Sequence, residues 1–480
     1  MKKKFYITTP IYYVNDLPHI GHAYTTIAAD VLARFHRERD EDVFFLTGTD
    51  EHGLKIQHSA EEAGKDPQKF VDEISGEFKK LWDKLNVKYD NFIRTTDPAH
   101  KKAVGKVLQA LYEQGAVYKG EYEGLYCVAC EQFRQENELV EGRCPDHDIV
   151  LERVKEECYL LKLADIQSRL VEKIEGDEFA IRPEKYKKEV LSFLKNEKLK
   201  DISISRKKVS WGIPMPFDKE HTTYVWVDAF LNYLTGLGWD GSTLELGSRV
   251  SSGVTRFWPA DVQLIGKDIL RVHATIWPAI LVHLGIPLPK MLFVHGHIRS
   301  GGRKMGKTLG NVISIKEMLE KFGADGTRYL LMSAGTFGED VDVTMERMVE
   351  KYNADLANGI GNLVSRIVKL WEGTDIEIPN VKTGDWSEFY KFTFDEINID
   401  KGLDYIWRNI VSKANKCIEE KKPWELKKAN PEKFEHNLKE LLVDLKFFSD
   451  LVFPFMPETS QKIKKALETK KAEILFPRVK

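Results

Sequence analysis

The chain has 480 residues, of which 42% are hydrophobic and 30% are charged. A chain of this length is expected to form roughly three domains, and its composition excludes a disordered, collagen-like or membrane-embedded protein. It has no apolar run of about 18 residues and no apolar signal core at its start, so neither a membrane span nor secretion is predicted. Residues 401–480 hold 18 Lys and Arg against 12 Asp and Glu. That excess favours a polyanionic partner only weakly, because a solvated helical surface has the same composition.

The first fifty residues have the pattern of a strand, a helix and a second strand. Residues 5–13 are rich in β-branched and aromatic side chains, which predicts a buried strand. From Ala23 to Phe35 apolar residues recur at helical spacing. A short apolar run at 43–46 then leads into Thr47-Gly-Thr-Asp50. This order predicts the opening βαβ unit of a doubly wound parallel sheet.

Later elements predict a second half of the same sheet and a separate helical region. Strands are expected at 263–265 and 291–294, with a helix at 270–284 between them, and helical periodicity dominates after residue 350. The predicted fold class is therefore α/β, a Rossmann-type domain with an insertion, followed by an α-helical bundle. The predicted boundaries are 1–117 and 222–322 for the two halves of the Rossmann domain, 118–221 for the cysteine-containing insertion, 323–350 for a linker and 351–480 for the helical domain.

A compact histidine motif, His19-Ile-Gly-His22, stands where the first helix is expected to begin. Free backbone N–H groups and the positive end of the helix dipole make such a position suitable for phosphate. Gly21 has no Cβ, so a nucleotide can approach the backbone closely. Imidazoles three residues apart also share one helical face. The alternative is a histidine pair at a helix start that binds no ligand.

A basic loop flanked by glycines follows almost three hundred residues later, at Arg303-Lys-Met-Gly-Lys-Thr308. Lysine suits a phosphate clamp because its compact charge sits on a flexible stem. Stabilising the charge on a departing pyrophosphate is a recognised catalytic role for such residues. The spacing of a Walker loop is absent. The alternative is an exposed run of solvated charge.

These two motifs, in this order and with a helical domain after them, resemble the class I aminoacyl-tRNA synthetases. Within that class, Pro10–His22 and Thr47–Gly53 look like the methionyl-tRNA synthetases. The resemblance runs from about residue 5 to about residue 475. In this chain, Gly306 and Thr308 replace the two serines of the family's Lys-Met-Ser-Lys-Ser signature, and both lysines are present. This departure bears on the closure of the loop. Further matching segments are Trp211–Pro216, Tyr224–Ala229 and Gly266–Asp268.

The resemblance implies a methionine–tRNA ligase that uses ATP with Mg²⁺. The methionine carboxylate attacks the α-phosphate of ATP, and the terminal ribose of the tRNA then takes the methionyl group. By family position, the catalytic phosphate contacts are His19, His22, Lys304 and Lys307. The other ATP contacts that the family implies are Gly21, Gly266, Asp268 and His295.

The implied methionine pocket is apolar and aromatic, as suits a thioether. Asp50 is the residue that the family places at the substrate's α-ammonium, which is a charge-assisted contact. Phe230 stands where some family members have proline. For each aromatic residue the alternative is plain core packing. By family position the pocket is lined by Ile11, Tyr13, Trp226, Ala229, Tyr233 and His273.

Cys127-Val-Ala-Cys130 and, after thirteen residues, Cys144-Pro-Asp-His147 form a CxxC…CxxH pattern. Three thiolates and one imidazole suit tetrahedral zinc with no open position, so one structural zinc per chain is predicted. The family also carries a zinc knuckle in its insertion. The alternative is a set of reduced thiols without metal. Cys158 lies outside this spacing and is predicted to be a packing residue.

The segment 353–366 resembles the family's anticodon-reading helix. Asn362 and Arg366 share a helical face, where an amide can read base edges and a guanidinium can stack or bind phosphate. Trp424 is the implied stacking platform for an anticodon base, the alternative being a core tryptophan at a helix start. The implied partners are therefore tRNA(Met), methionine and ATP.

The sequence also leads to expectations for the oligomeric state and the cellular location of the protein. The chain ends near Pro477 without the appended domain of some family members, so a monomer is expected. Five cysteines in a large chain without a secretion signal argue against a disulfide scaffold and favour the cytoplasm.

Three other functions compete with this interpretation. One is a class I synthetase for another amino acid, such as leucine, isoleucine, valine or cysteine. The branched-chain enzymes usually carry a large editing insertion, and the insertion here is too short for one. A small-molecule nucleotidyltransferase can share the histidine motif but needs no basic helical domain. A degenerate synthetase kept as an RNA-binding scaffold would not need the intact histidines and lysines.

Overall fold

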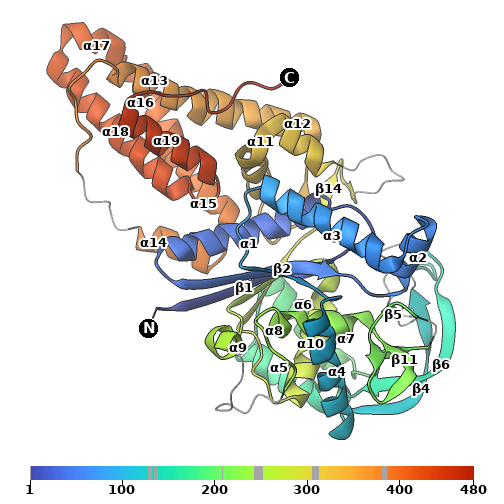
Figure 1. Cartoon of the computed structure of the whole chain (residues 1–480). Helices are drawn as coiled ribbons and strands as arrows, with labels where there is room; N and C mark the ends of the chain where they lie inside the picture. Colours follow the sequence, from blue (N-terminus) through green and yellow to red (C-terminus); the bar gives the residue numbers. More distant parts are fainter. Residues whose placement is uncertain are drawn as a thin grey trace. The chain divides into compact units, whose positions relative to one another are not determined.

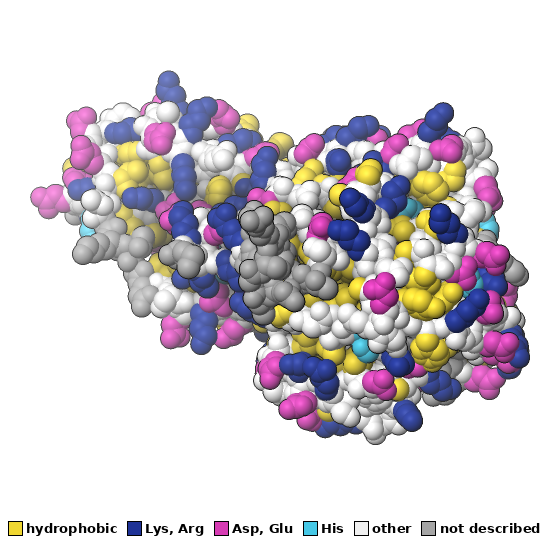
Figure 2. Space-filling view, turned by 60° about the horizontal axis from the view of Figure 1, so that its bottom comes forward, with side chains coloured by type: hydrophobic (Ala, Val, Ile, Leu, Met, Phe, Trp, Pro, Cys, Tyr) yellow, Lys and Arg dark blue, Asp and Glu magenta, His cyan; other side chains and the backbone are white. Residues whose placement is uncertain are grey.

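The computed structural model describes residues 2–127, 132–134, 136, 139–145, 148–207, 209–242, 252–304, 313–380 and 386–480. The chain divides into two compact units. The first comprises residues 1–18, 41–80 and 89–294, and the second comprises residues 19–40, 81–88 and 295–480. No described helix is long and apolar enough to cross a membrane. On the face shown in Figure 2, basic and acidic side chains are interspersed, which agrees with the small net charge.

A six-stranded sheet in the order β3-β2-β1-β12-β13-β7 forms the centre of the first unit (Figure 1). β1 pairs in parallel with β2 and β12, β2 with β3, and β13 with β7. The strand order reverses at β1, and open α/β sheets bind ligands at the carboxyl ends of strands at such a point. The strands are β1 (Lys4–Tyr13), β2 (Asp42–Asp50), β3 (Asn91–Arg94), β12 (Val262–Gly266), β13 (Met291–His295) and β7 (Ala180–Arg182).

The predicted fold class is confirmed. α1 (Ile20–Glu38) stands between β1 and β2 in the chain, as the strand–helix–strand pattern predicts. β12 and β13 occupy the two later predicted strands, with α10 (Leu270–His283) between them. β1 is buried without a break from Phe5 to Thr9, which is why its sequence is a continuous rather than an alternating apolar run.

One part of the predicted insertion belongs to the central sheet instead. β7 is the edge strand beside β13, with Ala180 opposite Met291. A three-residue strand has too short a pattern to be recognised, and its partner lies more than a hundred residues away. The rest of the insertion forms the antiparallel sheets β5-β4-β6-β8 and β10-β11-β9. The elements are β4 (Val117–Cys127), β5 (Gln132–Arg134), β6 (Glu152–Leu161), α5 (Gln167–Glu175), α6 (Glu184–Asn196), β8 (Ile202–Ser203), β9 (Ser205–Arg206), β10 (Pro214–Met215) and β11 (Asp218–Thr223).

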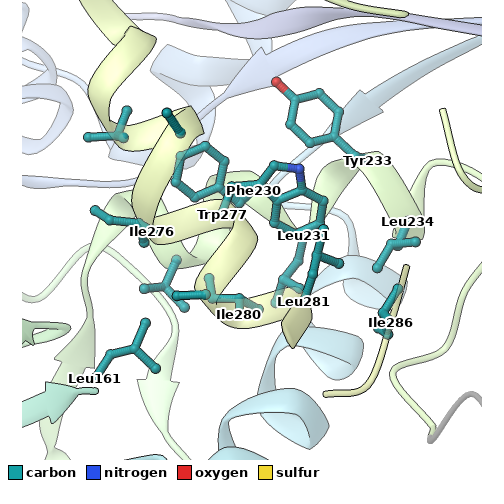
Figure 3. Close-up of a cluster of buried hydrophobic side chains, with 14 of the residues drawn as sticks. Leu161, Phe230, Leu231, Tyr233, Leu234, Ile276, Trp277, Ile280, Leu281 and Ile286 are labelled. Carbon is teal, nitrogen blue, oxygen red and sulfur yellow. The ribbon is translucent and has the colours of Figure 1, made fainter. Parts of the chain in front are cut away.

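A large hydrophobic core of the first unit includes the side chains of α10 (Figure 3). Phe230 stacks on Trp277 with ring centroids 5.8 Å apart, and Tyr233 lies 5.6 Å from the same indole. Burial of each large apolar side chain contributes about 1.5–3 kcal/mol, so this core holds the short helices α7 and α8 against α10. The helices of this unit also include α2 (Leu54–Glu62), α3 (Pro67–Lys84), α4 (Pro98–Glu113), α7 (Val225–Phe230), α8 (Asn232–Thr235) and α9 (Ser252–Phe257).

The second unit is mainly helical, as predicted for the C-terminal region. Lys422 has a left-handed backbone with φ 42°, and it separates the helices α16 and α17. A small sheet in the order β15-β14-β16 precedes the helices, with β14 (Ile298–Ser300), β15 (Arg303–Lys304) and β16 (Val341–Asp342). The helices are α11 (Ile315–Met332), α12 (Met345–Lys351), the π-helix η5 (Tyr352–Gly361), α13 (Asn362–Trp371), α14 (Ser387–Tyr390), α15 (Ile399–Ile406), α16 (Lys413–Lys421), α17 (Pro423–Ala429), α18 (Pro431–Val452) and α19 (Pro457–Thr469).

A fully buried arginine, Arg328 on α11, connects distant segments of the second unit. Its guanidinium lies 2.7 Å from the carboxylate of Asp30 on α1. It also donates to the backbone carbonyls of Pro454 and Phe455, which follow α18. A buried charge is tolerated only when it is paired in this way.

Candidate active site

Several predicted substrate residues gather at the carboxyl ends of three neighbouring strands in the first unit. Tyr13, at the end of β1, is opposite Asp50, at the end of β2. Ile11 is opposite Gly48 in the same pairing. Gly266 ends β12, the neighbour of β1 on its other side. The structure therefore brings these candidates to the point where the strand order reverses, which is the expected ligand edge of such a sheet.

The segment that carries Asp50 is held by a buried network around the next residue, Glu51. Arg94 donates to both carboxylate oxygens of Glu51, at 2.7 and 2.9 Å. The hydroxyls of Thr49 and Thr96 donate to the same carboxylate, and the indole of Trp211 donates to the Glu51 carbonyl at 2.6 Å. These contacts fix the backbone on either side of Asp50, which preorganises its carboxylate.

A second buried cluster joins this segment to α7. One carboxylate oxygen of Asp228 lies 2.6 Å from Nδ1 of His52, and the other lies 2.8 Å from Nε2 of His100. Burial by itself raises the pKa of Asp228, but the two imidazoles outweigh it and lower the pKa to about 2. Nδ1 of His100 lies 2.7 Å from the Thr235 hydroxyl. No role for this cluster, or for Glu51 and Arg94, was predictable from the sequence alone, although His52 and Asp228 lie inside the matched motifs.

The predicted methionine pocket is aromatic and uncharged. His273 donates from Nδ1 to the Ile269 carbonyl at 2.9 Å, so its Nε2 accepts from the Tyr233 hydroxyl at 2.9 Å. Burial lowers the pKa of His273 to about 4, which leaves the imidazole neutral at pH 7. Phe230 meets its ring edge-on at 4.9 Å. The indole of Trp226, half-buried, lies 6.5 Å away.

Such a pocket favours a polarisable thioether over a charged side chain. Ala229, which follows Asp228 on α7, is buried and contributes no polar atom from its side chain. On the nucleotide side, Gly266 is buried, while Asp268 is exposed in the short turn after β12. An exposed carboxylate at a strand end is suited to accept hydrogen bonds from ribose hydroxyls.

The two motif histidines form the start of α1 in the second unit. His19 is the N-cap, and its Nδ1 accepts from the Gly21 N–H at 3.1 Å. Nδ1 of His22 accepts from the His19 N–H at 3.3 Å. The two rings stack with centroids 3.6 Å apart. Since each Nδ1 is an acceptor, the proton of each neutral imidazole is on Nε2, where it can be donated to a phosphate oxygen.

This arrangement depends on a glycine between the histidines. A Cβ at Gly21 would lie 3.0 Å from Cε1 of His19, which is closer than an ordinary contact. Burial, together with the neighbouring charge of His19, lowers the pKa of His22 well below its usual value. His22 is therefore neutral at pH 7, and it would bind a phosphate through an N–H donor rather than through a positive charge.

Two other nucleotide candidates, His295 at the end of β13 and Lys304 in the small sheet, belong to the second unit. Nε2 of His295 is 2.7 Å from the Thr25 hydroxyl and its Nδ1 is 2.8 Å from the Gly296 carbonyl, so both ring nitrogens have protein partners. In the antiparallel pairing of β14 with β15, the backbone of Lys304 lies opposite that of Arg299. Lys307 and the two departures beside it, at 306 and 308, lie outside the described residues.

Half of the predicted zinc ligands can be located. Cys127, at the end of β4, and Cys144 are buried in one small cluster with Leu151. Cys130 and His147 lie outside the described residues, and the described part of the chain contains no complete metal-ligand group. Two soft thiol donors in one apolar cluster fit a structural zinc. Cys158 is buried on β6, which fits its predicted packing role.

The three predicted anticodon residues lie close together on the second unit. Asn362 begins α13, and Arg366 follows one turn later on the same helix. The guanidinium of Arg366 lies over the ring of Trp424, the second residue of α17, at 5.8 Å from its centre. Trp424 is 48% exposed, so its indole is not a core residue.

Comparison with known proteins identifies the family. The family described as tRNA synthetases class I (M) matches residues 5–153 and 150–368, and the anticodon binding domain of methionyl tRNA ligase matches residues 384–478. The methionine–tRNA ligase of Caldanaerobacter subterraneus subsp. tengcongensis is 42% identical, over 100% of this chain and 79% of that protein. The chain belongs to the class I methionyl-tRNA synthetase family. The resemblance found in the sequence motifs is therefore confirmed.

Other members of the family agree with this assignment. The methionine–tRNA ligase of Rickettsia prowazekii is 41% identical, over 99% of this chain and 95% of that protein. The structure of Mycobacterium tuberculosis methionyl-tRNA synthetase in complex with methionyl-adenylate superposes with a TM-score of 0.89 at 34% identity, and covers 99% of this chain and 98% of that one.

Proposed function

We propose that this chain is a methionine–tRNA ligase, which activates L-methionine with ATP and transfers it to tRNA(Met). The observation that carries the proposal is the neutral aromatic cluster around His273, on the same unit as Asp50, which ends a strand at the switch point of the sheet. An uncharged pocket suits the thioether, and a carboxylate suits the α-ammonium. Family membership supports the same reaction.

The chemistry requires positioning and charge stabilisation more than covalent participation of the protein. A methionine carboxylate oxygen forms a bond to the α-phosphorus, and the bond from that phosphorus to pyrophosphate breaks. His19 and His22 donate N–H groups to the phosphates, while Lys304 and Lys307 bind the β- and γ-phosphates. Mg²⁺ offsets the charge of the triphosphate. The terminal ribose hydroxyl of the tRNA then attacks the methionyl carbonyl, and AMP leaves.

An ATP–pyrophosphate exchange assay with each amino acid in turn, followed by tRNA charging, tests this function. Exchange is expected with methionine alone, followed by charging of tRNA(Met). Exchange with another amino acid would instead identify a different synthetase. Absence of exchange with every amino acid would favour an RNA-binding scaffold.

Replacing Trp424 by alanine is expected to reduce the charging of tRNA about 10- to 100-fold, because a base stacked on an aromatic face contributes about 1–3 kcal/mol. Methionine-dependent exchange is expected to stay at the wild-type level. Tyr405 is 44% exposed in the same unit, so Tyr405→Ala is the matched control and should charge normally. An equal loss of exchange and charging in Trp424→Ala would indicate a folding defect instead.

We further propose one structural zinc, held by Cys127, Cys130, Cys144 and His147. Elemental analysis of protein purified without chelators is expected to find about one zinc per chain. Cys144→Ser should lose the metal, because it replaces a thiolate ligand, while Cys158→Ser should retain it. A metal-free wild-type protein, or zinc loss in both variants, would contradict this site.

The five segments bounded at 117, 221, 322 and 350 are the proposed domains. A monomer in the cytoplasm, where translation takes place, is the proposed state. Light scattering is expected to give a mass near 55.3 kDa, and twice that mass would show a dimer.

A further inference from the structure

A short segment of the insertion, residues 210–213, joins the two parts of the first unit that carry the proposed methionine contacts. It contains the start of the matched motif at Trp211, to which no function has so far been given. One end of the segment bonds to the backbone that follows Asp50 at the end of β2. The other end bonds to the last residue of β11, directly before α7.

Trp211 fastens the segment to the residues after Asp50. Its indole donates to the Glu51 carbonyl at 2.6 Å, and its own carbonyl accepts from the Gly53 N–H at 3.1 Å. Its ring centroid lies 5.6 Å from that of the His52 imidazole. Glu51 is fully buried, so water does not compete for its carbonyl. Because these hydrogen bonds run in both directions, Trp211 and the 51–53 backbone hold each other in place.

The other end of the segment is fixed against β11. The Thr223 N–H donates to the Ile213 carbonyl at 2.7 Å, and the Ile213 side chain is buried in the core that includes α10. Gly212 packs so closely that a Cβ there would lie 2.5 Å from Cγ2 of Thr222. Thr223 is the last residue of β11, and Tyr224 is the N-cap of α7. The segment therefore reaches from the end of β2 to the start of α7.

The spacing between these two parts matters for a ligand as small as methionine. Its α-ammonium is proposed to bind Asp50, whereas its thioether is proposed to lie near Trp226 on α7. Both contacts form at once only when the two parts are held within about 0.5 Å of the productive geometry. The bond from His52 to Asp228, at 2.6 Å, links the same two parts at one point, and the 210–213 segment supplies a second point.

We propose that Trp211 is a positioning residue for methionine, which sets the spacing between the Asp50 carboxylate and the thioether pocket on α7. The inference rests on the proposed methionine-activating function and adds a role for the motif that begins at Trp211. Trp211 acts through the backbone of Glu51 and does not itself contact the substrate. Its effect is therefore expected only with ligands that bind both Asp50 and α7.

The first test is the steady-state kinetics of ATP–pyrophosphate exchange in Trp211→Phe, which keeps an aromatic ring but removes the N–H donor. The KM for methionine is expected to rise about five- to tenfold, because a hydrogen bond to a buried carbonyl is lost. The kcat and the KM for ATP should stay within about twofold of the wild type, since a contact made equally in the ground state and the transition state acts on KM alone.

Trp371→Phe is the matched control for this variant. The indole of Trp371 donates to the Ile376 carbonyl at 2.7 Å in the second unit. The control therefore makes the same chemical change away from the methionine contacts, and it should leave the KM for methionine unchanged. An equal rise of that KM in Trp371→Phe would overturn the proposal.

Two competitive inhibitors separate positioning from a general loss of structure. L-Methioninol keeps both the α-ammonium and the thioether, whereas γ-(methylthio)butyrate lacks the ammonium and cannot bind Asp50. In Trp211→Phe, inhibition by methioninol is expected to weaken by the same factor as the KM for methionine rises. Inhibition by γ-(methylthio)butyrate should stay at the wild-type level. Equal weakening of both inhibitors, or of neither, would overturn the proposal.

Gly212→Ala is an independent variant of the same segment. Its added Cβ forces the segment away from Thr222 but keeps the indole, so the KM for methionine should rise here too. A lower kcat with an unchanged KM in both variants would show a folding role only and overturn the proposal. If the wild type activates methionine and Trp211→Phe keeps its KM and both inhibition constants, this inference fails and the proposed function stands. A wild-type protein that activates no methionine contradicts the proposed function itself.

Discussion

His19→Asn is expected to lower methionine-dependent ATP–pyrophosphate exchange about 100-fold or more while leaving α1 stable. His19 caps the helix through Nδ1 and carries a proton on Nε2 that can be donated to phosphate. Asparagine is among the best N-cap residues, so it preserves the cap but cannot place a donor where Nε2 was. Removal of one preorganised donor to developing charge costs about 10²–10³ in kcat. Exchange kinetics and thermal unfolding measure the two effects separately.

The matched comparison for this variant is His19→Ala. It loses the cap as well, so it should show the same drop in exchange together with about 1 kcal/mol less stability. Gly21→Ala should also reduce exchange, because the added Cβ forces the His19 ring to move. If His19→Asn exchanges pyrophosphate at the wild-type rate, the imidazole is a helix cap and not a phosphate ligand.

Asp228→Ala is expected to lower the free energy of unfolding by about 3–5 kcal/mol and to raise the KM for methionine. It leaves two buried imidazoles without their shared acceptor. The same carboxylate joins α7, which carries Trp226 and Ala229, to the segment after Asp50, so the pocket loses its geometry. Denaturant unfolding and the methionine dependence of exchange measure these effects.

Asp228→Asn is the conservative control and should be milder. Its oxygen can still accept from His52, and its NH₂ group can donate to Nε2 of His100 once that ring changes tautomer and donates to Thr235. If Asp228→Asn is as unstable as Asp228→Ala, these replacement hydrogen bonds do not form.

The contribution of Asp228 to the free energy of unfolding is expected to decrease as the pH falls. The folded-state pKa of Asp228 is lowered to about 2 from an ordinary value of 3.8, so its stabilising contribution is present above the ordinary pKa and is lost as the pH falls toward 2. The stability difference between the wild type and Asp228→Ala should therefore shrink as the pH falls below about 4. A difference that grows below that pH would contradict this assignment.

Elements with local patterns were predictable from the sequence. β1 and α1 were recognised because the strand is a continuous buried run and the helix repeats its apolar residues every three or four positions. Asp50 and Trp226 were predicted as site residues because they lie inside matched motifs. In the structure Asp50 is at the carboxyl end of β2, and Trp226 lies beside His273. Their roles toward substrate stay predictions. The β7 strand was missed, because three residues show no period.

The sequence by itself determined the family and the class of chemistry, because motif residues are close together in the chain and their order is specific. It also predicts which charged residues bind ATP and tRNA. Only the tertiary structure revealed the His52–Asp228–His100 cluster and the contact of Trp211 with Glu51. These partners are separated by 176, 128 and 160 positions. A contact of that kind is created by the packing of whole elements and leaves no local pattern.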